Sequence, residues 1–405
     1  STYNTNYNEL AADPYKPFNN RALGLPYPPG STYKMVTTIA AIDSGTISRW
    51  TEIEDEGVYT RFEDAGYMPR CMLYTTTGAT HGLINVMKAL AVSCNYYFYE
   101  AGYRTGITAI DNTAKALGLG EPTGIELPEA TGRRANPETK KELYDEGHDG
   151  WYDADTVAAS IGQSENRFTP LQLCSYTAAL ANRGVRYTAT LLKRVLSSDY
   201  QKLIRENQPV VASTLNISDE AYAAYSEGMR EAVTSGTAYS AFVGYDVAVC
   251  AKTGTAQHGS GGSDNASFVL YAPADDPEIA VLVMLDEPQK NNQYGSVIAA
   301  PVVGNILADI LPYLGFEPNY TEEQLSSADM ATPYLINYGL QDAQTNLVQA
   351  GLQYRVVGNG TVVVNQTPGA AMPIPGGGTV VLYTEEVEKQ TAAVPYVIGK
   401  SGNEA

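Results

Sequence analysis

Three apolar segments in the second half of the chain restrict its fold more than any other feature. Their sequences are DVAVCAKTGTA (246–256), ASFVLYAP (266–273) and IAVLVMLDEP (279–288). All three are rich in residues that suit buried strands, and the turn-forming segment ADDPE separates the last two. We therefore expect adjacent antiparallel strands at the centre of a mixed sheet.

A helix is expected to begin at or near Ser31. The segment STYKMVTTIAAIDSG (31–45) carries apolar residues at helical spacing and stops at Gly45. Pro28 and Pro29 cannot extend this helix backward, and serine is a favoured N-cap residue. The segment therefore predicts a partly buried helix that starts with Ser31.

A second helical pattern runs through GLINVMKALAVS (82–93), and the aromatic-rich NYYFYEAG (95–102) follows it. The pattern breaks near Ser93, so residues 93–95 are expected to form a short connection between two helices. Four apolar residues of the first segment would share one helix face: Leu83, Val86, Met87 and Leu90.

The charge balance excludes one class of partner. The formal net charge is −19 at pH 7, whereas binding to a nucleic-acid backbone depends on lysine and arginine displacing counterions. The chain has no run of about 18 apolar residues, and its first residues, STYNTNYNEL, lack the pattern of a signal peptide. A length of 405 residues with 44% hydrophobic content indicates a globular chain of at least two domains.

Cysteine and histidine are too scattered to form a recognisable motif. There is no C-x-x-C pair and no histidine at metal-binding spacing, so the sequence predicts neither a metal site nor a disulfide framework. No histidine lies in an H-E-x-x-H or triad context, so any acyl transfer is expected to use another base. The residues concerned are Cys71, Cys94, Cys174, Cys250, His81, His148 and His258.

The chain changes character after residue 331. One short amphipathic helix is followed by strands that glycines punctuate, which predicts a small separate domain. The opening of this region, TPYLINYGLQDA (332–343), recurs without gaps as VPYVIGKSGNEA (394–405). The chain is therefore expected to include the first residues of a second copy.

Ser31 and Lys34 are a candidate nucleophile and base. At positions i and i+3 they share a helix face, and the helix dipole at an N-terminus favours an alkoxide and disfavours an ammonium. Lys34 could then be neutral enough to accept the Ser31 proton. The alternative is a helix cap followed by a solvated lysine.

Two further sets of polar residues each have a functional and a purely structural interpretation. Ser93 and Asn95 could both point into a cleft, or they could simply hydrogen-bond the backbone of a turn. The segment 252–255 (KTGT) would place a cation and two hydroxyls at a sheet edge, where Gly254 would let a ligand approach the backbone closely. Each group alone is common by chance.

The ordered set of these motifs resembles a known family. S-x-x-K, S-x-N and K-T-G occur in that order, each on the expected helix start, interhelical turn and strand. The stretches DPYKPFNNRALGLPYPPGSTYKM, SIGQSENRFTPLQL and APADDPEIAVLVMLDEP resemble the transpeptidase domain of class B penicillin-binding proteins, from residue 1 to about 315. The region after residue 331 resembles the PASTA repeats that follow such domains.

The resemblance implies a fold and its boundaries. The first domain would be an α/β (α+β) serine transpeptidase or β-lactamase-like domain at residues 1–318, with a central, mostly antiparallel sheet and helices on both faces. A small α+β PASTA-like domain would occupy residues 331–385, and residues 386–405 would be a linker and the start of a second repeat. Members of the family have a membrane anchor, a pedestal domain, a helix and edge strands before the segment that resembles the first residues of this chain. The first domain would therefore be N-terminally truncated.

The resemblance also implies roles for the motif residues. Ser31 would be acylated and Lys34 would be its general base. Ser93 would relay a proton to the leaving amine, and Asn95 would hydrogen-bond the substrate peptide or Lys34.

The remaining motif residues would bind the substrate. Lys252 would supply positive potential, and the hydroxyls of Thr253 and Thr255 would hold its terminal carboxylate, next to Gly254. The backbone N–H groups of Ser31 and Thr255 would form the oxyanion hole. No cofactor or metal is implied.

One departure from related enzymes bears on the reaction. The middle residue of S-x-N is Cys94, where class A β-lactamases have aspartate, and no glutamate-bearing loop of their kind is evident. Both points favour a transpeptidase over a hydrolase. Cys94 and Cys250 themselves are expected to be small buried thiols.

The implied activity is peptidoglycan D,D-transpeptidation through a Ser31 acyl-enzyme. The substrates would be stem peptides ending in D-Ala-D-Ala, and β-lactams would acylate the same serine. The alternatives are a β-lactamase or D,D-carboxypeptidase, or a non-catalytic sensor of β-lactams or muropeptides. The parent protein would be membrane-anchored at the extracytoplasmic face, with the cell-wall synthesis machinery as its partner.

Overall fold

The computed structural model describes residues 2–242, 247–256, 264–288, 294–314, 329–370, 372–375 and 378–385. The chain divides into two compact units, Ser1–Pro318 and Asn319–Ala405. The segment 386–405, for which we predict the start of a second repeat, lies outside the described residues.

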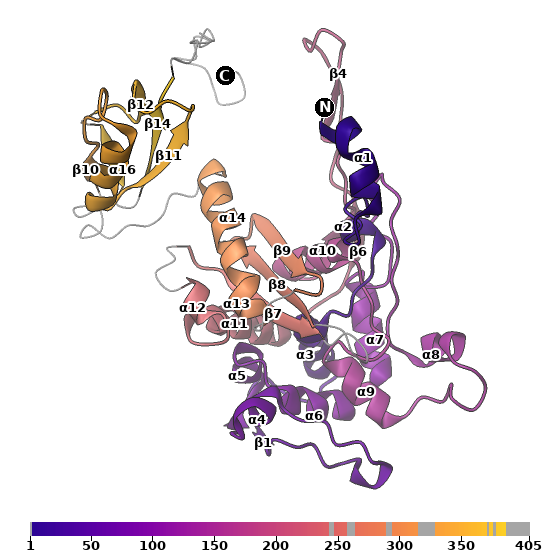
Figure 1. Ribbon diagram of the computed structural model, residues 1–405. Helices are drawn as coiled ribbons and strands as arrows, with labels where there is room; N and C mark the ends of the chain where they lie inside the picture. The colour runs from indigo at the N-terminus through magenta and orange to yellow at the C-terminus, as the bar shows by residue number, and fades with distance from the viewer. Residues whose placement is uncertain are drawn as a thin grey trace. The chain divides into compact units, whose positions relative to one another are not determined.

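A three-stranded sheet forms the centre of the first unit (Figure 1). Its strands are β7 (Cys250–Ala256), β8 (Asn265–Ala272) and β9 (Ile279–Leu285), in that order. Both neighbouring pairs are antiparallel, with Lys252 opposite Val269 and Val269 opposite Leu282. The three strands predicted from the sequence are confirmed, although the described part of the sheet is antiparallel throughout rather than mixed.

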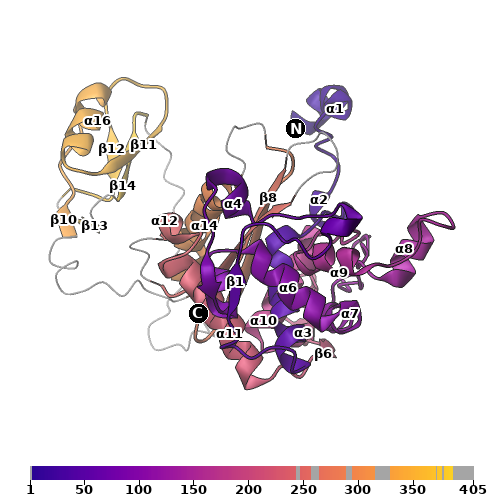
Figure 2. The ribbon, with the colours of Figure 1, turned by 90° about the horizontal axis from the view of Figure 1, so that it is seen from below.

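Helices cover both faces of this sheet, which confirms the predicted layering (Figure 2). Side chains of β8 alternate between two hydrophobic clusters, because successive residues of a strand point to opposite faces. Val269 and Tyr271 pack in the cluster that includes α3 (Lys34–Asp43), α10 (Pro170–Ala181) and α11 (Asp219–Thr234). Phe268 and Leu270 pack in the cluster that includes α12 (Tyr239–Phe242) and α14 (Ala300–Tyr313), and the short α13 (Gly295–Ile298) also contacts β8.

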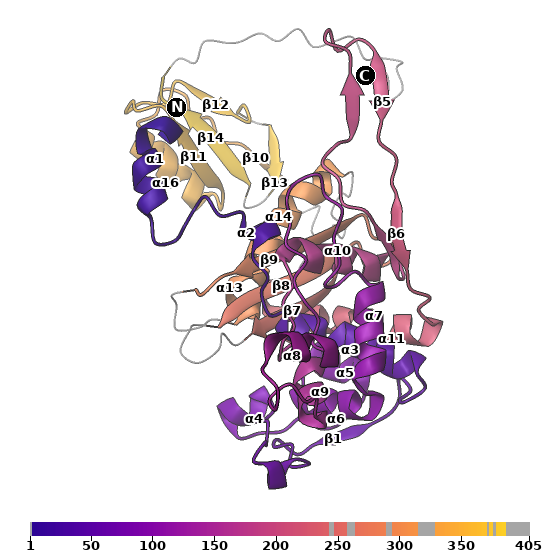
Figure 3. The same ribbon diagram turned by 90° about the vertical axis from the view of Figure 1, so that its right-hand side faces the viewer.

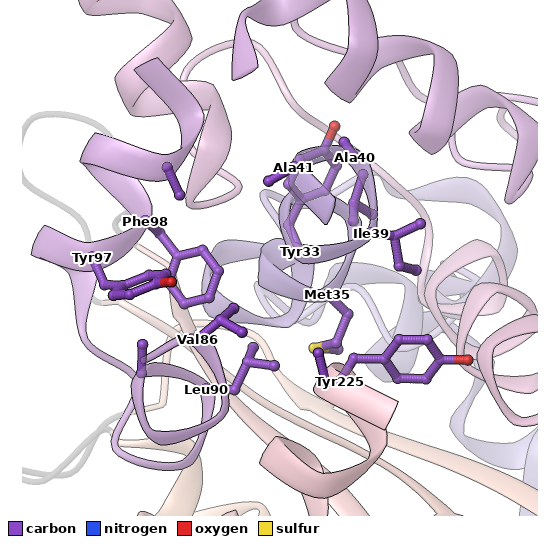
Figure 4. Close-up of a cluster of buried hydrophobic side chains, with 14 of the residues drawn as sticks. Tyr33, Met35, Ile39, Ala40, Ala41, Val86, Leu90, Tyr97, Phe98 and Tyr225 are labelled. Carbon is purple, nitrogen blue, oxygen red and sulfur yellow. The ribbon is translucent and has the colours of Figure 1, made fainter. Parts of the chain in front are cut away.

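The helix that begins after Ser31 is the centre of the larger core. A short 3₁₀ helix, η1 (Gly30–Tyr33), leads directly into α3 (Lys34–Asp43). Residues 34–42 of α3 are all buried, so the helix is more enclosed than the sequence pattern indicated. Figure 4 shows its Met35 between Val86 and Leu90 on one side and Tyr225 on the other, with Ile39 one turn further along the helix.

The second predicted helix is shorter than its apolar pattern. Residues Gly82–Ile84 form a strand, β2, paired with β1 (Ile53–Asp55), and α5 covers only Val86–Ala91. Leu83 is therefore 58% exposed instead of lying on a buried helix face. The physical reason is Asn85, whose side chain accepts a hydrogen bond from the Lys88 N–H and so caps the helix. The predicted connection at residues 93–95 is confirmed, because α6 begins at Asn95 and ends at Thr105.

The rest of the first unit surrounds this core. Four further strands form two pairs, β3 with β6 and β4 with β5, along an arm that projects from the domain (Figure 3). Their bounds are β3 (Val185–Tyr187), β4 (Arg194–Leu196), β5 (Leu203–Glu206) and β6 (Val211–Thr214). The remaining helices are α1 (Thr2–Ala12), α2 (Arg21–Gly24), η2 (Glu63–Ala65), α4 (Met72–Thr77), α7 (Ile107–Ala116), α8 (Pro137–Leu143) and α9 (Asp153–Ser160).

The second unit combines one helix with short strands, as the sequence predicts. Helix α16 (Leu340–Gln349) packs beside a sheet of order β11-β14-β12, in which β11 and β14 are parallel. The strands are β10 (Asp329–Ala331), β11 (Gln353–Val357), β12 (Asn365–Thr367), β13 (Pro373–Pro375) and β14 (Thr379–Tyr383). Within the described residues of both units, no helix is both long and apolar enough to span a membrane.

Two helix glycines give a matched test of the packing. A Cβ on Gly228 of α11 would lie 2.8 Å from Leu90 Cβ and 3.0 Å from the Met87 carbonyl oxygen, whereas the nearest atom to a Cβ on Gly304 of α14 is 3.9 Å away. We expect Gly228→Ala to lower the free energy of unfolding by about 1–3 kcal/mol through overpacking. Gly304→Ala should raise it by about 0.5–1 kcal/mol. Urea denaturation measures both, and equal effects would contradict the packing of α11 on α5.

Candidate active site

Ser31 is fixed by a close approach of three backbone segments. Gly30, with φ of 54°, donates its N–H to the Gly162 carbonyl at 3.1 Å. A Cβ on Gly30 would lie only 2.6 Å from the Thr255 carbonyl oxygen. Only glycine allows η1 to approach β7 this closely, and this approach brings Ser31 beside Thr255.

Lys34 is fully buried at the start of α3, and its ammonium group has three acceptors. Nζ donates to the Asn95 side-chain oxygen at 2.7 Å, to the Ser93 carbonyl at 2.8 Å and to Ser93 Oγ at 3.3 Å. It also lies 5.3 Å from the centre of the Phe98 ring. Burial lowers the pKa of Lys34 to about 8, because the charged form loses its hydration.

Lys252 approaches the same serine from the sheet. Its Nζ donates to Ser93 Oγ at 2.8 Å and to the Thr253 carbonyl at 3.1 Å. Burial, followed by the charge of Lys34, lowers the pKa of Lys252 well below its usual value. Ser93 thus joins two buried lysines, and it holds this position with φ of 58°, in the sparsely populated left-handed region.

Five of the motif residues line one cavity of about 300 Å³, whereas the fully buried Lys34 and Lys252 lie behind its lining and contact it through Ser93. A second hollow of about 500 Å³ shares Ser31, Asn95 and Thr255 with it. The wall formed by α4 and the end of α5 is largely apolar. The lining residues of the first cavity are Ser31, Met72, Leu73, Thr76, His81, Val92, Ser93, Asn95, Thr237, Thr253, Thr255, Tyr294, Gly295 and Ser296.

Two details differ from the expected arrangement. Gly254 is absent from the described lining of either hollow; a Cβ there would lie 2.1 Å from Ser267 Oγ and 2.8 Å from Thr32 Cγ2. The glycine therefore makes room for neighbouring protein atoms rather than for a ligand. Among the described residues, no hydrogen bond joins Ser31 Oγ to Lys34 Nζ, although both side chains belong to the same site.

Thr237 is a cavity residue that the sequence analysis missed. It follows α11 and shares a hydrogen bond of 3.1 Å with Thr253 through their hydroxyl groups. It stands outside every recognised motif, so only the fold brings it to the site.

A cluster of four potential metal ligands lies behind the Ser93–Asn95 turn. The ligand atoms of Asp55, Cys71, His81 and Cys94 all lie within 4.8 Å of one another. Cys71 Sγ is 3.8 Å from Cys94 Sγ and 3.5 Å from His81 Nδ1, and Cys94 Sγ is 3.5 Å from Asp55 Oδ2. The sequence predicts no metal site, because these residues come from four separate segments with no motif spacing.

Some distances in this cluster match zinc ligands, but one does not. His81 Nδ1 lies 2.7 Å from Asp55 Oδ2, which is a hydrogen-bond distance, so both groups could bind one metal ion only after this contact opens. Zn–S bonds of about 2.3 Å and Zn–N bonds of about 2.0–2.1 Å give tetrahedral edges of about 3.8 Å between two sulfurs and about 3.5 Å between sulfur and nitrogen. The hydrogen bond from Cys94 is the main influence that lowers the pKa of Cys71, which favours the thiolate form that metals bind. Burial, followed by the contact with Cys71, raises the pKa of Cys94, so only one of the two thiols favours this form in the metal-free protein. Cys94 is fully buried, as predicted, but its surroundings are polar rather than inert.

Metal binding by this cluster can be measured directly. After dialysis against Zn²⁺ and then against metal-free buffer, we expect about one zinc ion per chain, measured by inductively coupled plasma mass spectrometry. Cys71→Ser and His81→Ala should lose most of this zinc, whereas Cys174→Ser, which changes a cysteine outside the cluster, should retain it. Equal zinc content in all four proteins would contradict the assignment of these ligands.

Comparison with known proteins identifies the family. Residues 1–308 match the family model for the penicillin binding protein transpeptidase domain. This chain belongs to that family. Residues 331–386 match the PASTA domain, so the resemblance to class B penicillin-binding proteins with PASTA repeats is confirmed.

Proteins similar to this chain carry names that refer to sporulation or to peptidoglycan transpeptidation. Stage V sporulation protein D of Bacillus subtilis (strain 168) is 32% identical over 380 residues, which cover 90% of this chain and 55% of that protein. Peptidoglycan D,D-transpeptidase MrdA of Acinetobacter baumannii is 31% identical over 309 residues, which cover 72% of this chain and 44% of that protein. This chain spans about half the length of the curated relatives it matches.

Solved structures of penicillin-binding proteins share the fold. PBP2 of Pseudomonas aeruginosa matches with a TM-score of 0.66 and 28% identity, covering 79% of this chain and 68% of that one. Penicillin-binding protein A of M. tuberculosis, as a ceftriaxone acyl-enzyme complex, matches with a TM-score of 0.65 and 25% identity, covering 75% and 65%. The predicted serine transpeptidase fold is therefore confirmed.

Proposed function

We propose that this chain is a peptidoglycan D,D-transpeptidase and a covalent target of β-lactams, with Ser31 as the acylated residue. The observation that carries the proposal is the hydroxyl of Ser93, which hydrogen-bonds both buried lysines in the cavity that Ser31 lines. Curated relatives are named as D,D-transpeptidases, and a neighbouring structure is an acyl-enzyme with a β-lactam. These names support the same reaction for this chain.

Acylation of Ser31 would begin with proton transfer to Lys34 and end with departure of the amine. The neutral amine of Lys34 takes the Ser31 proton as the alkoxide attacks the carbonyl carbon of the D-Ala-D-Ala amide. The backbone N–H groups of Ser31 and Thr255 are proposed to bind the oxyanion, and such a donor is worth about 3–4 kcal/mol in the transition state. Collapse breaks the C–N bond, and the proton reaches the leaving amine through Ser93, whose hydroxyl already contacts Lys34.

The sheet side of the cavity is proposed to hold the terminal carboxylate. Thr253 and Thr255 supply hydroxyls, and Thr237 orients the first of them. Burial disfavours the charged form of Lys252 in the free protein. An incoming carboxylate would raise the pKa of this lysine again, so its charge would be present when the substrate binds.

A second amine would then accept the acyl group from Ser31. The second hollow beside Ser31 leaves room for a peptide on the other side of the nucleophile. Hydrolysis by a β-lactamase or D,D-carboxypeptidase would use water instead of the amine. A sensor would form the adduct without turnover.

The cellular setting is proposed from relatives. A PBP2–MreC complex from Helicobacter pylori and a peptidoglycan synthase complex are among the structural neighbours. We infer a similar association with cell-wall synthesis proteins for the parent of this chain, at the extracytoplasmic face of the membrane and through an anchor outside these residues.

The first test is covalent capture. Incubation with a labelled penicillin should add one molecule of the drug to Ser31, detected by mass spectrometry of the intact chain and its peptides. The adduct should persist for many minutes, since the cavity is proposed to deliver an amine and not water. Ser31→Ala should form no adduct, and Ser44→Ala, at an exposed serine beyond α3, should react as the unaltered chain does.

The lifetime of the penicillin adduct distinguishes a transpeptidase from a hydrolase. Rapid loss of the adduct with release of hydrolysed drug would indicate a β-lactamase and contradict the transpeptidase proposal. Absence of any adduct on the natural sequence would contradict the whole assignment of Ser31.

The pKa of Lys34 sets the pH dependence of acylation. Because burial lowers this pKa to about 8, the fraction of neutral base should rise about tenfold per pH unit below 8 and level off above it. The second-order rate of penicillin acylation, measured from pH 6 to 9.5, should follow this curve. Asn95→Ala removes an acceptor of the charged form, so it should shift the midpoint to lower pH. A flat profile would exclude Lys34 as the base.

A further inference from the structure

Two arginines face each other on a backbone bridge away from the Ser31 cavity. Arg133 and Arg167 form an isolated antiparallel bridge and exchange backbone hydrogen bonds of 2.7 and 2.9 Å. Partners in such a pair project their side chains to the same side, at close range. Like charges placed directly opposite each other destabilise the folded chain. Burial, followed by the charge of Arg133, accordingly lowers the pKa of Arg167.

Neither arginine has a carboxylate partner among the described residues. Arg133 Nε donates to the Glu165 carbonyl at 3.2 Å, and Arg167 Nη1 donates to the carbonyls of Ser164 and Asn166 at 2.9 and 2.7 Å. The other guanidinium nitrogens have no acceptor within the described part of the chain. Arg133 is exposed and Arg167 is half-buried. Their neighbour Arg134, by contrast, pairs with Asp111 and Glu121.

The nearby acidic side chains are already engaged. Both oxygens of Glu129 accept hydrogen bonds from the residues 123–124, at 2.7 to 3.1 Å. Glu165 accepts from the Tyr144 hydroxyl at 3.1 Å and from the Ser164 hydroxyl. These carboxylates moderate the local charge, but they do not bind the guanidinium groups.

The two arginines line a cavity of about 530 Å³ with Pro26, Glu129 and residues 130–132. Both walls of this cavity continue to the catalytic serine. Pro26 lies five residues before Ser31, and Arg167 lies five residues after Gly162, which binds the Gly30 N–H. Five extended residues span at most about 18 Å, which is an upper limit on the distance of each wall from the residues beside Ser31 and is comparable to the length of an extended pentapeptide.

We propose that Arg133 and Arg167 bind a carboxylate of the peptidoglycan stem peptide, at a subsite separate from the cavity that holds the scissile bond. The identity of this ligand rests on the proposed function. A guanidinium pair matches a carboxylate through two parallel N–H···O bonds, and the anion relieves the repulsion between the two charges. The cost of the like-charged pair is then offset when substrate binds.

The test uses the Ser31→Ala chain, so that binding is measured without turnover. The probe is the stem pentapeptide L-Ala-γ-D-Glu-L-Lys-D-Ala-D-Ala, with its glutamyl carboxyl either free or amidated, in isothermal titration calorimetry. We expect Arg133→Gln and Arg167→Gln each to raise the Kd for the free-carboxyl peptide about tenfold. Amidation should cause a similar loss, and it should cause no further loss in the arginine variants. Arg194→Gln, an exposed arginine on β4, is the matched control and should leave the Kd unchanged.

Three results would overturn the proposal. The first is equal affinity of the arginine variants and the parent for the free-carboxyl peptide. The second is arginine-dependent binding of a glycerol phosphate oligomer tighter than that of the peptide, which would assign the site to a phosphodiester. The third is a fall in the Tm of Arg133→Gln by several degrees with no change in Kd, which would show a structural role. Acylation of the natural chain by penicillin tests the proposed function independently of these outcomes.

Discussion

The hydroxyl of Ser93 is the atom on which the arrangement of the site depends. It accepts a hydrogen bond from Lys34 at the start of α3 and another from Lys252 on β7, so it joins the helical core to the sheet. Removing two ammonium groups from water costs several kcal/mol per charge unless hydrogen bonds compensate for it. The oxygens of Ser93 and Asn95 supply most of that compensation for Lys34. The depressed pKa of Lys34 reflects the part of this cost that the hydrogen bonds do not offset, and it suits the role of base that we propose for this lysine.

The turn that carries Ser93 is supported from behind by polar groups. Cys94 caps α6 through its sulfur and contacts Cys71 and Asp55, which belong to the layer of β1, β2 and α4. Any ligand held by this cluster would therefore stiffen the residues on either side of Cys94, which are the ones that hold the lysines. Cys94 thus belongs both to the turn that holds the lysines and to the cluster behind it.

Much of the site could be predicted from the sequence, because local patterns encode its parts. Pro29 and Gly30 fix where η1 begins, and the break after Val92 marks the interhelical turn. The four-ligand cluster could not be predicted, since Asp55, Cys71 and His81 meet only after β1 pairs with β2 and α4 folds beside them.

At two residues, Leu83 and Gly254, the sequence pattern indicates a different environment from the one in the structure. The apolar spacing of Leu83 matched a helix, yet the cap at Asn85 excluded it, because a side-chain hydrogen bond outweighs one periodic position. For Gly254, the sequence shows that a side chain is missing but not which neighbour requires its absence; the structure identifies Ser267 and Thr32 as those neighbours. Contacts distant in sequence decide both cases.

The close contact of glycines around Ser31 also limits how this site can vary. Added side chains at Gly30, Gly162 or Gly295 would meet backbone oxygens at 2.6 Å or less. These three glycine positions are thus closed to larger residues, whereas the wall formed by α4 is not. That wall presents exposed or half-buried side chains, such as Met72, Leu73 and Thr76, which can be exchanged without moving the backbone. Selection for altered binding at this cavity would therefore act on the α4 wall, while these three glycines stayed the same.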